Sequence, residues 1–223
     1  MSRGAVLFDW DGTLTDGIEG VWIIQDFLFK NYIHKPYPIT PSQLRDQMGK
    51  GLYVDTYVDY TIYRQLHDQH LEQLDQYQLT HLPSIWFDVP EAMNRLRQAG
   101  FSLVLVSGAQ PKQLKTELDH SGLTFDMVTW ANIPVGQQID PLGKAPRIKT
   151  ILNQHPEWKE VYYLGDTPKD ANACYEADPQ KNRILPILIA RSFTPRSQLE
   201  AVATTVLSIS DATDLIITGH LFK

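Results

Sequence analysis

The stretch Phe8-Asp9-Trp10-Asp11-Gly12-Thr13-Leu14 decides the fold, because it closes an apolar run over residues 5–10 with two acids and a glycine. An apolar run that ends in polar residues and Gly12 predicts a buried strand with a functional loop at its carboxyl end. Alternate side chains of an extended chain point the same way, so Asp9 and Asp11 can share one pocket. Their like charges repel unless a cation lies between them, and oxygen ligands of this kind suit Mg²⁺. The sequence therefore predicts a metal site where the first strand ends.

Strand-like and helix-like segments alternate through most of the remaining chain. Further apolar runs predict strands at residues 101–106, 127–131, 161–164, 184–190 and 205–209. Helical patterns lie beside them, at residues 90–99, 110–120, 145–154, 171–177 and 195–203. Continuous apolar runs are typical of parallel strands that are covered on both faces. The alternation predicts an α/β fold with a Rossmann-like, doubly wound parallel sheet.

The segment between the first and second strands breaks this rhythm. Residues 21–32 form a helix-like stretch rich in large apolar side chains, a proline-rich turn follows at 35–38, and Ser42 opens another helical pattern. No strand pattern persists there. We therefore expect an all-helical cap domain over residues 16–87, inserted into a core domain made of residues 1–15 and 88–223.

A second acidic motif follows another apolar run, in the stretch Tyr163-Leu164-Gly165-Asp166-Thr167-Pro168-Lys169-Asp170. The carboxyl ends of parallel strands meet at one edge of a sheet, so Asp166 and Asp170 are expected to join Asp9 and Asp11 there. Their spacing predicts that Asp166 binds the metal directly. Asp170 is either another ligand or an outer partner of the ligands.

Two further motifs offer groups that bind a phosphate. Ser107 and Gly108 close the second predicted strand at the same sheet edge, and Lys144 stands just before a predicted helix. A phosphate needs hydrogen-bond donors and positive charge, which a serine hydroxyl and a lysine ammonium supply. The sequence alone leaves open that Ser107 only caps a helix and that Lys144 lies on the surface.

The four motifs, in this order, resemble those of the haloacid dehalogenase (HAD) superfamily. They are Asp9-x-Asp11-Gly12-Thr13, Ser107, Lys144 and Gly165-Asp166-x-x-x-Asp170. The resemblance covers nearly the whole chain, because relatives carry a helical cap after the first motif. Many relatives read Gly-Lys-Pro-x-Pro in the third motif, where this chain reads Gly143-Lys144-Ala145-Pro146-Arg147. The cap type and motif order are most similar to the phosphoglycolate-phosphatase-like branch.

The resemblance implies a chemistry for each motif. Asp9 would attack phosphorus and form an aspartyl-phosphate, and Asp11 would act as general acid and then as general base. Mg²⁺ would be held by Asp9, Asp11 through its backbone carbonyl, and Asp166. The implied phosphate-binding residues are Thr13, Ser107, Gly108 and Lys144. The family's dehalogenases lack an acid at the position of Asp11, so phosphoryl transfer is expected rather than carbon–halogen cleavage.

Several functions use the same residues. A phosphomutase of the β-phosphoglucomutase type would pass the phosphoryl group from Asp9 to a sugar instead of water. A phosphonate hydrolase would need a cap lysine that forms a Schiff base, for which the cap offers Lys30, Lys35 and Lys50. A non-catalytic binding protein that keeps the fold is the third alternative. For substrate specificity we consider Arg45 and Lys50, in a basic, glycine-bearing stretch of the cap.

Composition limits the partners. The chain has 223 residues and a formal net charge of -6, with no basic run, so nucleic acid is not an expected partner. Its single cysteine, Cys174, cannot form an internal disulfide, and no signal peptide or membrane-spanning stretch is evident, so we expect a cytoplasmic protein. The expected partner is a small phosphorylated metabolite, bound by a monomer or homodimer.

Overall fold

A wholly parallel, six-stranded sheet with the order β3-β2-β1-β4-β5-β6 forms the centre of the protein. We describe a computed structural model, over residues 3–49, 69–131, 143–192 and 194–219. The strands are β1 (Gly4–Phe8), β2 (Phe101–Val106), β3 (Met127–Thr129), β4 (Glu160–Gly165), β5 (Ile184–Ile189) and β6 (Thr204–Val206). The order reverses direction beside β1, as in a doubly wound fold. The predicted fold class is confirmed.

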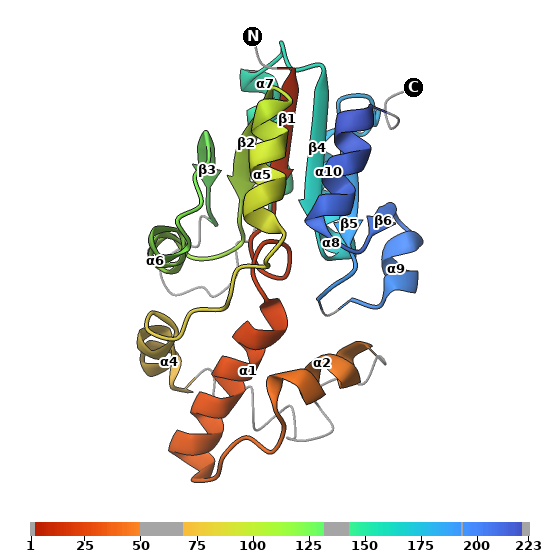
Figure 1. Cartoon of the computed structure of the whole chain (residues 1–223). Helices are drawn as coiled ribbons and strands as arrows, with labels where there is room; N and C mark the ends of the chain where they lie inside the picture. Colours follow the sequence, from red (N-terminus) through yellow and green to blue (C-terminus); the bar gives the residue numbers. More distant parts are fainter. Residues whose placement is uncertain (1–2, 50–68, 132–142, 193, 220–223) are drawn as a thin grey trace.

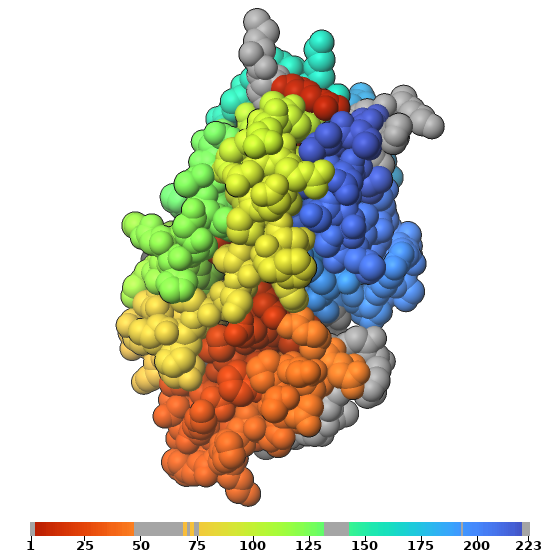
Figure 2. Space-filling view, in the orientation of Figure 1, coloured from red at the N-terminus to blue at the C-terminus, as the bar shows by residue number. Residues whose placement is uncertain are grey.

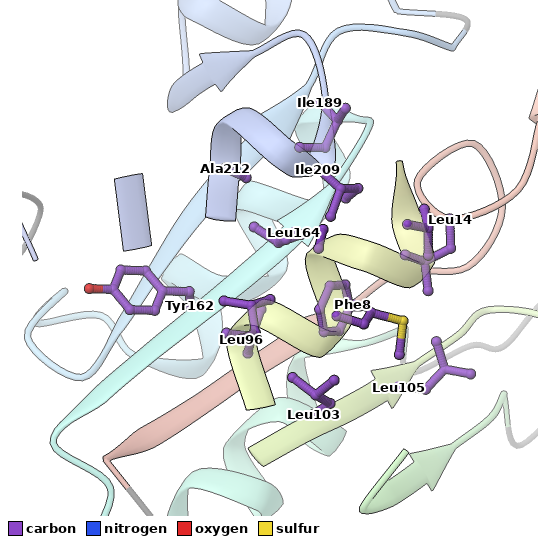
Figure 3. Close-up of a cluster of buried hydrophobic side chains, with 14 of the residues drawn as sticks. Phe8, Leu14, Leu96, Leu103, Leu105, Tyr162, Leu164, Ile189, Ile209 and Ala212 are labelled. Atoms are coloured by element: carbon purple, nitrogen blue, oxygen red, sulfur yellow. The ribbon is translucent and has the colours of Figure 1, made fainter. Parts of the chain in front are cut away.

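Helices cover both faces of the sheet (Figure 1). Those of the core are α5 (Val89–Gln98), α6 (Pro111–Ser121), α7 (Ala145–Gln154), α8 (Pro168–Ala177), α9 (Arg196–Glu200) and α10 (Ile209–Thr218). The side chains of Val6 and Phe8 on β1 lie on the sheet face that α5 and α10 cover (Figure 3). Those of Ala5 and Leu7 lie on the opposite face, which α7 and α8 cover. Because successive side chains enter opposite faces, a strand buried on both sides must be apolar throughout.

The last predicted strand is partly wrong. Strand β6 ends at Val206, and Ile209 belongs to α10, a helix that we did not predict. The hydroxyl of Ser208 accepts a hydrogen bond from the backbone N–H of Asp211 at 3.0 Å and so caps the start of this helix. Helix α8 also begins earlier than predicted, at Pro168, because Thr167 and Asp170 form a capping box.

Helices without strands follow β1, in agreement with the sequence pattern. They are α1 (Gly17–Leu28), the π-helix η1 (Phe29–Ile33), α2 (Pro41–Gly49) and α4 (Leu71–Gln78). The carboxylate of Asp16 accepts hydrogen bonds from Ile18 and Glu19 at 3.1 Å, which is why α1 starts four residues before the predicted helix. These helices lie beyond the carboxyl ends of the strands (Figure 1) and form the lower part of the molecule in the view of Figure 2. Helices α1, η1 and α2 bury an apolar cluster that contains Ile18 and Leu44, whereas Tyr77 of α4 packs against Phe27 and Leu28 of α1.

Two chain segments join the helical part to the sheet, and they pair with each other. Thr15 and Ile85 form an antiparallel bridge, Trp86 N–H donates to the carbonyl of Leu14 at 3.0 Å, and Asp16 N–H donates to the carbonyl of Ser84 at 2.8 Å. We call this pairing of residues 14–16 with 84–86 the joint. The division into a core and a cap over 16–87 stays a prediction. In the described part of the chain, no helix has the length and apolar character needed to cross a membrane.

Candidate active site

Three carboxylates gather where β1 and β4 end. Phe8 is in register with Leu164, and the backbone N–H of Asp9 donates to the carbonyl of Leu164 at 2.8 Å. Asp9 and Asp166 therefore leave neighbouring strands at the same sheet edge, and the first turn of α8 brings Asp170 to them. All three side chains are buried, with carboxylate oxygens within 4.8 Å of one another. The structure thus brings together three of the four predicted acids.

Lys144 lies against two of these acids. Its Nζ is 2.6 Å from Oδ1 of Asp9 and 2.7 Å from Oδ1 of Asp170, and only 17% of its side chain is exposed. Burial opposes the charged form, but the carboxylates of Asp170 and Asp9 outweigh it and hold the pKa of Lys144 well above its usual value. Lys144 is therefore a largely buried positive charge held between Asp9 and Asp170.

Asp170 has both oxygens engaged by protein groups. Oδ1 pairs with Lys144 and accepts from the hydroxyl of Tyr163 at 3.3 Å. Oδ2 accepts from the hydroxyl and the N–H of Thr167 at 2.7 and 3.1 Å. Although burial opposes ionisation, Lys144 and Thr167 together hold the pKa of Asp170 below its usual value. Asp170 is thus an anion whose orientation is set by its neighbours.

Asp9 and Asp166 have the opposite electrostatic character. Burial raises the pKa of Asp9 to about 7, and the charge of Asp170 adds to this while Lys144 opposes it. Burial also raises the pKa of Asp166 well above its usual value, with a further contribution from Asp9. Clustered carboxylates that are costly to ionise fit a divalent cation, and their hard oxygen atoms suit Mg²⁺. The residues present therefore fit the expected metal.

Asp11 lies outside this carboxylate group. Its side chain keeps an exposed surface, yet the surrounding protein displaces much of its water, which raises its pKa to about 7. The negative charge of Glu117 adds to the shift. Glu117 is itself buried, and it accepts a hydrogen bond from the indole of Trp10, between the two acids of the loop. An exposed acid with a raised pKa can exchange a proton with a bound molecule.

Gly12 lets the loop pass close to Asp166. Its φ is +78°, in the left-handed region, and a Cβ at this position would collide with the carboxylate of Asp166 and would lie 2.6 Å from the hydroxyl of Ser192. Only glycine combines this conformation with this approach.

The predicted phosphate-binding groups surround the same strand ends. The hydroxyl of Ser107 is buried and accepts from Ala109 N–H at 3.0 Å, which leaves its own hydrogen free to donate. Gly108 is exposed, and within the described residues no heavy atom lies within 4 Å of where its Cβ would be. Thr13 has a buried hydroxyl that has no hydrogen-bond partner among the residues described.

The basic residues predicted to act in the helical segment are engaged by other protein groups or lie outside the described residues. Arg45 forms an ion pair with Asp16, and its guanidinium lies over the ring of Trp86, 5.0 Å from the centroid. It is therefore engaged at the joint. Lys50 lies outside the described residues. Lys30, in η1, pairs with Asp26 of α1 at 2.7 Å.

Sequence reasoning missed Arg191 and Ser192, which follow β5 at the sheet edge that carries Asp9 and Asp166. The rule that strand carboxyl ends carry functional residues would have marked them, but their partners lie far away in the sequence. Arg191 binds Asp88 and Thr13, and Ser192 lies next to Gly12.

A sequence profile described as haloacid dehalogenase-like hydrolase matches residues 4–178. The chain belongs to the haloacid dehalogenase-like hydrolase family. No curated protein matches it significantly.

Solved structures with the same fold cover nearly the whole chain of this family member. A predicted phosphatase from Clostridium acetobutylicum has a TM-score of 0.64 and 18% identity, over 98% of this chain and 100% of that one. A haloacid dehalogenase-like family hydrolase from Streptococcus pneumoniae has a TM-score of 0.66 and 14% identity, over 96% and 98%. A predicted phosphoglycolate phosphatase from Haemophilus somnus has a TM-score of 0.62 and 16% identity, over 97% and 99%. At these identities, the likeness concerns the fold.

Proposed function

We propose that this hydrolase is a Mg²⁺-dependent phosphatase that cleaves small phosphomonoesters through a phosphoryl group carried on Asp9. One observation carries the proposal: the Asp9 carboxylate lies 2.6 Å from the Lys144 ammonium, among buried acids whose arrangement fits a divalent cation. A nucleophilic carboxylate beside a fixed cation suits the attack on an anionic phosphorus centre. Several structural relatives described as phosphatases support the same reaction class.

In the first step, Asp9 attacks phosphorus and the bond from phosphorus to the ester oxygen breaks. The departing oxygen takes the proton of Asp11, whose pKa of about 7 lets it hold that proton near neutral pH. In the second step, Asp11 accepts a proton from water as the water oxygen attacks phosphorus. The bond between phosphorus and Asp9 then breaks, which releases inorganic phosphate and restores the Asp9 carboxylate and the protonated Asp11.

The metal would be held by the side chains of Asp9 and Asp166 and by the backbone carbonyl of Asp11. When bound, Mg²⁺ offsets charge on the transferring group. We assign Asp170 to the outer position, because both of its oxygens are already engaged by Lys144, Tyr163 and Thr167. It orients Lys144 toward Asp9.

The phosphoryl oxygens would be held by Lys144, by the free hydrogen of Ser107 and by the N–H of Gly108, with Thr13 as a further donor. The buried, unpartnered hydroxyl of Thr13 within the described part of the chain supports its inclusion. The helices beyond the strand ends would exclude bulk water from the loaded site. Lys50 remains a proposed specificity residue, whereas Arg45 is better assigned to the joint.

A small phosphorylated metabolite is the proposed substrate, and a reducing cytoplasm is the proposed location, since a lone buried thiol such as Cys174 needs no oxidising compartment. Phosphate release should be measured for a panel of small phosphate esters, with Mg²⁺ and with EDTA. The proteins compared are the wild type, Asp9→Ala and Asp214→Asn, the last removing an exposed acid of α10 as a control.

Release that requires both Mg²⁺ and Asp9, and that survives in Asp214→Asn, is the expected result. Full activity in Asp9→Ala would refute the assigned nucleophile. If no ester is cleaved although Mg²⁺ binds, the phosphomutase or the binding protein becomes the better explanation. A sugar acceptor added to the assay separates these two.

A further inference from the structure

Arg191 connects the loop that carries Asp9 and Asp11 to the rest of the protein. Its Nη2 donates to the backbone carbonyl of Thr13 at 2.5 Å, and its Nη1 lies 2.6 Å from Oδ1 of Asp88. Only 10% of the Arg191 side chain and 6% of the Asp88 side chain are exposed. Because both partners are buried with it, the guanidinium has a defined orientation.

The second partner, Asp88, belongs to the start of α5, just beyond the joint. Its other oxygen accepts from the N–H of Ser210 in α10 at 3.2 Å, so it is tied to two helices. The Arg191 guanidinium also lies over the ring of Trp86, 4.8 Å from the centroid, and Trp86 N–H bonds to the carbonyl of Leu14. Arg191 therefore contacts Trp86 in the joint and Thr13 in the adjoining loop.

The next residue touches the same loop from another side. The buried hydroxyl of Ser192 and the carboxylate of Asp166 both lie against Gly12, so close that neither leaves room for a Cβ on that residue. The segment after β5 thus contacts the loop at Gly12 and at Thr13. The guanidinium donates one hydrogen bond to the Thr13 carbonyl while its other end is held by Asp88, and this restricts the peptide plane between Thr13 and Leu14.

We infer that Arg191 is a positioning residue, which holds the loop of residues 9–13 in its reactive geometry by fixing the Thr13 carbonyl to Asp88. This inference rests on the proposed phosphatase function. Arg191 donates to the backbone and does not belong to the groups assigned to substrate. Its loss should therefore lower kcat while KM changes little, because misplacing a nucleophile by a fraction of an ångström slows the chemical step.

The test compares Arg191→Gln with Arg191→Lys, using the best ester of the substrate panel at a temperature where each protein is folded. We expect kcat to fall about 10-fold or more in Arg191→Gln, with KM within about twofold of wild type. Arg191→Lys should be intermediate, since an ammonium cannot form both contacts in one plane. Arg95→Gln is the matched control, because Arg95 pairs with Asp214 at 2.5 Å between α5 and α10, outside the site. It should leave kcat unchanged.

Removal of Arg191 alone leaves Asp88 buried without its cation, and that variant can fail to fold. The double variant Arg191→Met/Asp88→Asn removes this charge while still lacking the donor to Thr13. A folded double variant with low kcat supports the inference. Wild-type kcat in the double variant would overturn it, since Arg191 would then act only by neutralising Asp88. Wild-type kcat in folded Arg191→Gln would overturn it too.

Hydrogen exchange of the backbone separates this inference from the proposed function. We expect faster exchange over residues 10–16 in the double variant than in the wild type, with β2 and α7 unchanged. If the wild type cleaves no ester, the phosphatase proposal fails while the exchange experiment still reports on the loop. Unchanged exchange over residues 10–16 would refute the positioning role by itself.

Discussion

The Nζ of Lys144 lies 2.6 Å from Oδ1 of Asp9, and this ion pair joins the start of α7 to the end of β1. The same ammonium is held by Asp170, which Thr167 and Tyr163 hold in turn. The position of the cation next to the proposed nucleophile is therefore fixed by a series of contacts that ends in the first turn of α8. It can neutralise charge at Asp9 without moving.

We expect Asp9→Asn to abolish turnover. Asparagine fills the same space but is not a nucleophile toward phosphorus, so the rate should fall by about 10⁴-fold or more. Phosphate release in single-turnover experiments measures this. Trapping of a phosphorylated wild-type protein at acid pH, absent in Asp9→Asn, provides the second readout, and phosphate label on the variant would contradict the assignment.

Lys144→Met should reduce both activity and stability. Loss of the cation removes charge stabilisation of the transferring group, for an expected decrease of about 10²–10³-fold in kcat. It also leaves two buried acids without their partner, so the free energy of unfolding should drop by ~3 kcal/mol. Urea denaturation and steady-state kinetics check these values. Lys149→Met, an exposed lysine of the same helix, should change neither.

Mg²⁺ should raise the melting temperature of the wild type. A ligand that binds only the folded state stabilises it by about 2.7 kcal/mol at a concentration 100 times its Kd. Asp166→Asn should lose this increase. Its metal-free melting temperature should be no lower than that of the wild type, because burial raises the pKa of Asp166 and a neutral amide avoids the cost of charging it. An undiminished Mg²⁺ effect in the variant would exclude Asp166 as a ligand.

Gly12→Ala should disrupt the loop. The left-handed φ of +78° and the collision with Asp166 both disfavour a side chain, and we expect a loss of about 2 kcal/mol or more in stability together with most activity. Gly20→Ala, inside α1, is the matched control, because among the described residues its Cβ would meet only Pro83, at an ordinary 3.9 Å. There alanine should stabilise by up to about 1 kcal/mol. Calorimetric melting of both variants provides the comparison.

Much of the fold followed from patterns that are local in the sequence. Apolar runs such as 101–106 and 161–164 correspond closely to β2 and β4, because a strand buried on both faces needs a continuous run of apolar residues. The segment around Ile209 was misread, since a short apolar run does not distinguish a strand end from the start of a capped helix.

The position of the candidate site could likewise be predicted from local sequence patterns. Asp9 and Asp166 directly follow apolar strands, and parallel strands bring such positions to one edge whatever the loops do. What Asp170 does could not be read in this way, since only the contacts of its two oxygens separate a metal ligand from a residue that orients Lys144.

Which residues far apart in the chain contact each other depends on packing alone. Arg191 reaches Thr13 across 178 positions and Asp88 across 103, and no sequence pattern links these residues. Arg45, expected at the substrate, instead lies over Trp86 and pairs with Asp16 at the joint. Strand and helix periodicity is encoded residue by residue, so the sequence determines which segments are strands and which acids end them. The choice of ion-pair partner depends on which side chains the folded core brings within about 3 Å, and that is a property of the tertiary structure.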